Sequence, residues 1–135
     1  MASVLEEKDA IRELMARYCF AFDRGRFDEW VELFTEDGCF DLGERGCHRG
    51  REALRKFLRM LPLTNGVPGM QHCVMNPIVH VDGTSATADS YVVVVQGGPT
   101  VGILVAGRYE DRLVQQDGGW RFLQRRVHFD LMPAQ

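Results

Sequence analysis

The amino-acid sequence changes its hydrophobic period once, between Leu61 and Met70, and this change limits the fold classes open to the chain. Before it, apolar residues recur at helical steps of three and four. After it come long runs rich in β-forming residues, at 70–81, 86–96, 101–114 and 119–131. Helices first and strands afterwards predict an α+β fold.

Three helices are predicted in the first half. The first starts near Val4, carries one apolar stripe and is followed by Gly25, a residue that readily adopts a left-handed cap conformation. The second is short; its apolar pattern continues to Phe34, and the turn Thr35–Gly38 is expected to end it. The third ends before Pro62, since proline cannot continue the helical hydrogen bonds.

Glycine-containing turns separate the four β-rich runs. Because such turns join hairpins, the runs are predicted to form an antiparallel meander. The turns are Asp82-Gly83, Gln96–Pro99 and Asp117–Gly119, and a further short strand is expected at Cys39–Leu42. We expect three helices packed on a strongly curved, mostly antiparallel sheet. This cone would leave an open end that serves as a pocket.

Composition narrows the function classes. The 135 residues are 45% hydrophobic and 26% charged, as in a globular chain, and we expect one domain over residues 1–135. The net charge is −3, and basic residues do not cluster, which argues against nucleic acid as a partner. Apolar runs such as Val92–Val95 are far shorter than the ~20 residues of a membrane helix. The acidic N-terminus does not resemble a signal peptide.

The cysteines and histidines give no metal signature. The four cysteines form no C-x-x-C pair, so we expect reduced thiols in a cytoplasmic protein, although Cys39 and Cys47 could bridge a loop. His72 and His80 are eight residues apart on one strand, too far for two ligands of one ion. We therefore expect no metal and no cofactor.

Asp23 and His72 are the strongest pair of polar candidates. Asp23 lies in the last turn of the first helix, where a partly buried carboxylate faces the negative end of the helix dipole and needs a partner. His72 is the best candidate for the partner of Asp23. Strand alternation places it on one face with Val74, Asn76, Ile78 and His80.

Tyr18 and Arg125 are the other polar candidates. Tyr18 lies near the middle of the first helix's apolar stripe, and Arg125 stands between Leu123 and Val127 on one strand face. An arginine there is either covered by a partner or reaches into the pocket. Taken singly, each of the four candidates has an ordinary structural explanation: a cap, a backbone-bonded histidine, a core tyrosine or an ion pair.

Four stretches taken together resemble the SnoaL-like group of the NTF2-like superfamily: Ile11–Asp23, Trp30–Gly38, His72–Ala88 and Gly107–Arg126. The resemblance runs from about Glu6 to about Phe129 and implies the α+β cone. The nearest pattern is the branch with scytalone dehydratase, bile acid 7α-dehydratase and hexachlorocyclohexane dehydrochlorinase.

In that branch an aspartate at the end of the first helix pairs with a histidine at the start of the first long strand. Asp23 and His72 occupy these positions. Tyr18 matches the tyrosine of the bile acid enzyme, and Arg125 matches the arginine of the dehydrochlorinase.

The resemblance implies a cofactor-independent lyase of the dehydratase type. His72, held by Asp23, would be the general base, Tyr18 would bond a carbonyl or enolate, and Arg125 would stabilise the departing anion. The substrate would be a hydrophobic cyclic or polycyclic molecule of steroid, polyketide or terpenoid size. The apolar wall of the pocket would consist of Trp30, Phe34, Phe57, Val92, Val94 and Phe129.

One departure from the branch keeps other functions open. The dehydratases carry a further histidine or aspartate near the position of Val92–Gly97, which here is apolar, glycine or glutamine. A ketosteroid-isomerase-like isomerase or a polyketide cyclase needs no leaving-group acid, and a non-catalytic binding or assembly module needs no base. The apolar outer face expected from Tyr91, Val93, Leu104 and Ala106 predicts a dimer or trimer.

Overall fold

The computed structural model describes residues 2–131. Its helical segments are α1 (Val4–Asp23), α2 (Phe27–Glu32), the 3-10 turn η1 (Gly43–Arg45) and α3 (Arg51–Arg59). Its strands are β1 (Phe34–Asp41), β2 (Cys47–Arg49), β3 (Met70–Asp82), β4 (Ser85–Gln96), β5 (Gly102–Gln116) and β6 (Gly119–Leu131). The predicted α+β fold and the four long strands are confirmed.

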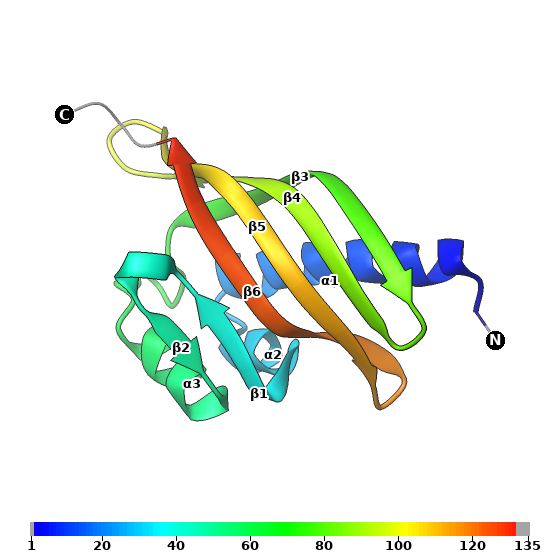
Figure 1. Ribbon diagram of the computed structural model, residues 1–135. Coiled ribbons are helices and arrows are strands. Elements are labelled where there is room, and N and C mark those ends of the chain that lie inside the picture. The colour runs from blue at the N-terminus through cyan, green and yellow to red at the C-terminus, as the bar shows by residue number, and fades with distance from the viewer. Residues whose placement is uncertain (1, 132–135) are drawn as a thin grey trace.

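The strands form one sheet in the order β2-β1-β6-β5-β4-β3. Neighbouring strands are antiparallel except for β1 and β6, which are parallel. The sheet curves around α1, while α2 and α3 lie together at the β1 end (Figure 1). β3 is therefore an edge strand, and α1 contacts it more extensively than any other strand.

Helix α1 has defined caps at both ends. Ser3 and Glu6 form a reciprocal capping box, with two hydrogen bonds of 3.1 Å. At the other end Gly25 has a φ of +72°, and the N–H of Arg26 donates to the carbonyl of Ala21 at 2.8 Å. This Schellman arrangement turns the chain immediately after Asp23 and so fixes where that side chain lies.

The core lies between the inner face of the sheet and the apolar stripe of α1. Tyr18, 1% exposed, stands at its centre, with aromatic rings from three other elements around it. These include Trp30, Phe34 and Phe122, each of which is fully buried. The helical stripe predicted from the sequence is the buried face of α1.

The short second helix ends earlier than predicted. Helix α2 ends at Glu32, and Phe34 already pairs with Phe122 of β6. The predicted turn Thr35–Gly38 therefore lies inside β1, where a register shift between Phe34 and Cys39 accommodates it. Parallel pairing with a strand 88 residues away outweighs the local turn preference of these residues.

A bulge in β3 changes which side chains face inward. The register of β3 against β4 shifts between Met75 and Ile78, and Asn76 has a φ of +55°. The single face predicted to include Asn76, Ile78 and His80 is therefore wrong beyond the bulge. Ile78 and His80 are exposed, and Val79 is buried instead.

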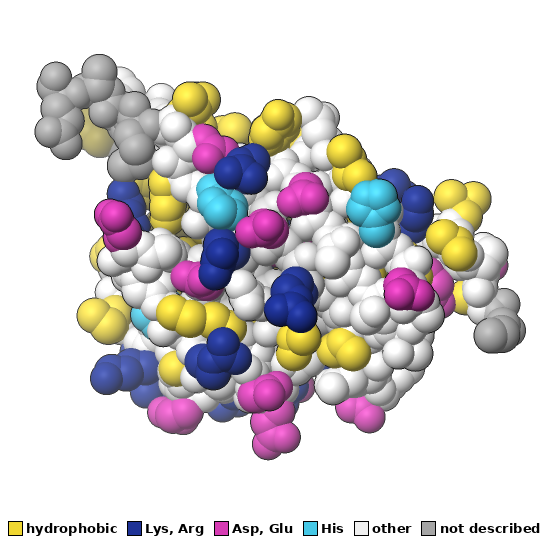
Figure 2. All heavy atoms as spheres, viewed as in Figure 1, with side chains coloured by type: hydrophobic (Ala, Val, Ile, Leu, Met, Phe, Trp, Pro, Cys, Tyr) yellow, Lys and Arg dark blue, Asp and Glu magenta, His cyan; other side chains and the backbone are white. Residues whose placement is uncertain are grey.

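The outward face of the sheet carries charged side chains over its middle (Figure 2). Arg108 pairs with Asp130 at 2.8 Å, and His128 lies 3.1 Å from Glu110. The apolar outer face expected from the sequence is partly present. Tyr91 and Leu104 are exposed and Val93 and Ala106 are half-buried, but charged residues such as Arg108 and Glu110 follow on β5. The oligomeric state stays a prediction.

Two further features bear on the sequence predictions. The four cysteines, all within the described residues, are free thiols, and the sulfur atoms of Cys39 and Cys47 are in contact across β1 and β2. Among residues 2–131, no helix is both long enough and apolar enough to cross a lipid bilayer.

Candidate active site

Asp23 and His72 form the centre of the candidate site. The carboxylate of Asp23 accepts two hydrogen bonds, both from His72. The backbone N–H of His72 donates to Oδ2 at 2.8 Å, and its ring Nδ1 lies 2.7 Å from Oδ1. The two side chains are only 13% and 8% exposed. The end of α1 and the start of β3 thus hold both groups in one geometry.

This contact defines the protonation pattern of the imidazole. An ionised carboxylate can only accept, so Nδ1 must carry the proton that it shares with Asp23. In the neutral ring the lone pair then lies on Nε2. No residue in the range 2–131 bonds to that nitrogen. The arrangement is that of a general base whose ring is oriented by a carboxylate.

Two aromatic rings fix the plane of the imidazole. Phe22 lies 4.9 Å from the His72 ring and Tyr18 lies 6.1 Å away, both in edge arrangements. These contacts exclude water from one side of the ring and leave it little freedom to rotate. A proton transferred to His72 would therefore be stabilised mainly by Asp23 rather than by solvent.

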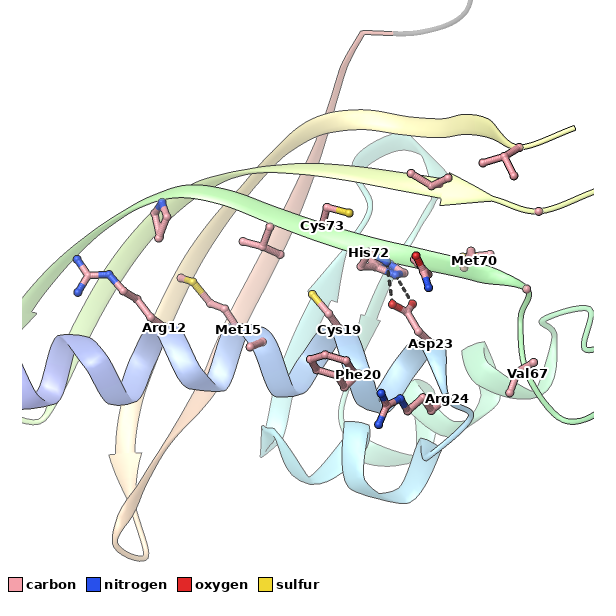
Figure 3. A pocket seen from close by; sticks show the side chains of 18 residues that line it. Arg12, Met15, Cys19, Phe20, Asp23, Arg24, Val67, Met70, His72 and Cys73 are labelled. Carbon is pink, nitrogen blue, oxygen red and sulfur yellow. Dashed lines mark hydrogen bonds and ion pairs between the residues drawn. The ribbon is translucent and has the colours of Figure 1, made fainter.

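The dyad opens on a groove of about 980 Å³ between α1 and β3. Figure 3 shows Asp23 reaching from the helix toward His72 on the strand, with the groove extending along both elements. The polar lining consists of Arg12, Asp23, Arg24, Gln71 and His72. The largest apolar lining side chains are those of Met15, Phe20, Val67, Met70, Val74, Pro77, Val95 and Val101.

Arg125 is buried in an ion pair and does not line this groove. It donates to both oxygens of Asp111 at 2.8 and 2.9 Å, and both side chains are fully buried. Its guanidinium also lies 3.6 Å from the ring centre of Tyr109 and 4.4 Å from that of Tyr18. Of the two alternatives left open by the sequence, the covered arginine is therefore the one found.

Asp111, the partner of Arg125, is itself fully buried. It faces the core from β5, which has neighbours on both sides, and it pairs directly with Arg125 of β6. Burial raises the pKa of Asp111, and Arg125 offsets part of this effect. Burial also disfavours the charged form of Arg125, but Asp111, together with Tyr109 and Tyr18, outweighs burial and raises the pKa of the guanidinium.

Tyr18 lies between this ion pair and the dyad. Its ring touches the guanidinium of Arg125 on one side and the edge of His72 on another, and it lies 5.7 Å from the ring centre of Tyr109. Burial raises the pKa of Tyr18 well above its ordinary value, with Arg125 opposing the shift. Tyr18 is therefore a neutral phenol, and it is not part of the groove lining.

The six residues expected to form the apolar wall are placed elsewhere. Four of them are buried in the core and two are half-buried at its margin: Trp30, Phe34, Val92 and Val94, then Phe57 and Phe129. None lines the groove beside the dyad. The physical reason is that the aromatic side chains of the helical half fill the narrow end of the cone.

The residues that do line the groove carried a signal in the sequence. Arg12, Ala16 and Phe20 precede Asp23 at steps of four, four and three, so they share its helix face. Met70 and Val74 alternate with His72 on β3. Within residues 2–131 there is no cluster of three or more histidine, cysteine or acidic side chains that could bind a metal ion.

Comparisons with known proteins agree with this architecture. A structure of an NTF2-like protein with a cystatin-like fold from Novosphingobium aromaticivorans matches with a TM-score of 0.84 and 28% identity, covering 94% of this chain and 84% of that one. This protein has the same α+β architecture, the NTF2-like cystatin-like fold.

Residues 3–126 match the SnoaL-like domain family, and the chain belongs to that family. It is 32% identical over 133 residues to the uncharacterized protein Rv2910c of Mycobacterium tuberculosis, covering 93% of this chain and 88% of the relative.

Two further solved structures are similar. One is an aspartate-to-asparagine variant of Rv3472, a protein of unknown function from Mycobacterium tuberculosis, with a TM-score of 0.83 and 32% identity over 96% of this chain and 78% of that one. The other is a Novosphingobium aromaticivorans protein provisionally named a scytalone dehydratase, with a TM-score of 0.80 and 27% identity over 94% of this chain and 86% of that one.

Proposed function

We propose that this protein is a cofactor-independent lyase of the dehydratase type, which uses the Asp23–His72 pair as a general base. The observation that carries the proposal is the bidentate contact of one carboxylate with the ring and backbone of His72, beside a largely apolar groove. The substrate is a hydrophobic cyclic or polycyclic molecule with an acidic C–H next to a carbonyl or opposite a leaving group.

The proton path follows from the free ring nitrogen. Nε2 of His72 takes the proton from carbon, and the C–H electron pair becomes a carbon–carbon double bond as the C–O bond of the leaving hydroxyl breaks. The imidazolium, stabilised by Asp23, returns the proton to the departing oxygen, which leaves as water. Atoms and charge balance without a further reactant.

Tyr18 and Arg125 act in this proposal as positioning residues. Tyr18 packs against the edge of the imidazole, and the guanidinium of Arg125, which is paired with Asp111, packs against the ring of Tyr18. Neither lines the groove, so contact with the substrate, which the resemblance implied for both, is not part of the proposal.

A second candidate, an isomerase or cyclase, is favoured by the groove lining. Among the described residues that line the groove, Asp23 is the only carboxylic acid, and it is engaged with His72. None of these lining residues carries a Ser, Thr or Tyr hydroxyl. An isomerase needs only one base, because His72 returns the proton to a different carbon of the same molecule.

Product mass distinguishes these functions. The protein and its His72→Gln variant are incubated with a panel of hydroxylated and unsaturated cyclic ketones, and the products are analysed by mass spectrometry and NMR. A lyase yields a product lighter by one water, and an isomerase yields a product of unchanged mass with a moved double bond. A non-catalytic module binds members of the panel and leaves them unchanged, which would contradict both proposals.

A further inference from the structure

The charges along the groove are unevenly balanced. Within residues 2–131, its lining contains two cations, Arg12 and Arg24, and one acid, Asp23. Both oxygens of Asp23 are already engaged with His72. The guanidinium of Arg24 lies 4.6 Å from the ring centre of Phe20, close to the dyad. Arg12 makes no ion pair, hydrogen bond or ring contact with any residue in the range 2–131.

Arg12 lies at the end of the groove away from the dyad (Figure 3). It precedes Asp23 by eleven residues on the same helix face, which corresponds to about 16 Å along the helix axis. Apolar side chains line α1 between them, namely Met15, Ala16, Cys19 and Phe20. A ligand that extends along α1 from Arg12 to His72 thus meets a cation, an apolar floor and the candidate base in turn. Val67 and Met70 continue the lining beyond the dyad (Figure 3).

We propose that Arg12 selects substrates that carry a carboxylate at the end of the skeleton remote from the reacting carbon. A guanidinium can bind a carboxylate through two parallel N–H···O bonds, which fixes orientation as well as position. With the carboxylate on Arg12, a polycyclic skeleton about 16 Å long places its other end beside His72. This inference rests on the proposed function only for which end of the ligand reacts; the anion site itself does not depend on catalysis.

The test uses pyrenebutanoate and its methyl ester, a fluorescent pair with the same polycyclic skeleton and different charge. Dissociation constants are measured by fluorescence titration for the unmodified protein and for Arg12→Gln. We expect Arg12→Gln to weaken binding of the carboxylate by about tenfold, as expected for loss of one charge-assisted contact, and to leave binding of the ester unchanged.

Two control variants locate the effect. Arg17 is on the same helix but outside the groove, where it lies 3.8 Å from Glu13, so Arg17→Gln should change neither affinity. Arg24→Gln should weaken binding of the carboxylate less than Arg12→Gln does. The proposal is overturned if Arg12→Gln weakens binding of the acid and of the ester equally, or weakens binding of neither. It is also overturned if the selectivity for the carboxylate disappears in Arg24→Gln instead.

The His72→Gln variant separates this inference from the proposed function. It should keep the preference for pyrenebutanoate over the methyl ester, because the anion contact lies at Arg12 and not at His72. If Arg12 discriminates acid from ester but no substrate is turned over, the catalytic proposal fails and the anion site stands. If turnover occurs but Arg12→Gln leaves the preference for the acid intact, only the anion site fails.

Discussion

Asp23 and His72 lie 49 residues apart in the chain, yet the carboxylate of the first accepts hydrogen bonds from both the backbone and the ring of the second. The backbone contact fixes β3 against the end of α1, and the ring contact fixes the tautomer. One side chain therefore sets both the position and the chemistry of the candidate base.

The tautomer of His72 should depend on Asp23. In Asp23→Asn, one polar atom of the side chain becomes an NH₂ donor, which cannot accept both N–H bonds. We expect the ring to lose its preference for the Nδ1–H form, and turnover to fall by about 10²–10⁴-fold. Nitrogen NMR of the imidazole reports the tautomer directly. An unchanged tautomer in Asp23→Asn would contradict this account of how the base is oriented.

The buried Arg125–Asp111 pair should support the fold. Asp111→Asn leaves a fully buried guanidinium without its counter-charge, and we expect a loss of about 3–5 kcal/mol in the free energy of unfolding. Urea unfolding of the unmodified protein and of Asp111→Asn measures this loss. The matched control is Glu52→Gln, which breaks an exposed pair with Arg59 and should change stability by less than about 0.5 kcal/mol. Equal effects of the two variants would contradict the assigned role.

The turn after Asp23 should be intolerant of a side chain. Gly25 has a positive φ, and a Cβ there would collide with the backbone carbonyl of Gly66. Gly83 also has a positive φ, but a Cβ there would meet no atom within 4 Å. We expect Gly83→Ala to lower the free energy of unfolding by about 1–2 kcal/mol, from backbone strain alone.

Gly25→Ala should lower the free energy of unfolding by about 1–3 kcal/mol more than Gly83→Ala does, because of the collision. It should also displace Asp23 and slow turnover. Thermal or urea unfolding of both variants gives the comparison. If Gly25→Ala were no less stable than Gly83→Ala, the close approach of the two loops would not be a constraint on the site.

The two groove cysteines should differ in reactivity. Burial raises the pKa of the Cys19 thiol to about 12, whereas Cys73 is exposed. At pH 8 a thiol with that pKa is only about one part in 10⁴ thiolate, and the thiolate is the form that reacts. Iodoacetamide should therefore label Cys73 first, with Cys19 labelled only on unfolding or at strongly alkaline pH. Mass spectrometry after a timed reaction decides this, and equal labelling rates would contradict the structure.

Periodicity predicted the fold and the places of Asp23 and His72 in it, and the resemblance to the SnoaL-like group implied that the two residues pair. The helical stripe placed Asp23 at the end of α1, and the change of period placed His72 at the start of β3. The distance between their atoms was not predictable, since it depends on how the helix crosses the sheet. The same limit applies to Arg125, for which the sequence left open a covered position or one in the pocket. Its partner, Asp111, depends on the register between β5 and β6.

Bulges account for much of what alternation missed. A one-residue bulge reverses the faces of a strand, so Asn76 separates the inward-facing His72 from the outward-facing His80. The groove lining was missed for a different reason. The large aromatic residues were expected at the ligand, but they fill the core, and smaller side chains beside the dyad form the groove wall.

The most direct test of the central claim is proton exchange at carbon. A cyclic ketone that binds the groove is incubated in D₂O with the unmodified protein, with His72→Gln and with His80→Gln, whose histidine is on the exposed side of β3. The account predicts deuterium incorporation next to the carbonyl by the unmodified protein and by His80→Gln, and a rate at least about 10²-fold lower for His72→Gln. Exchange that persists at full rate in His72→Gln, while the ligand still binds, would contradict it.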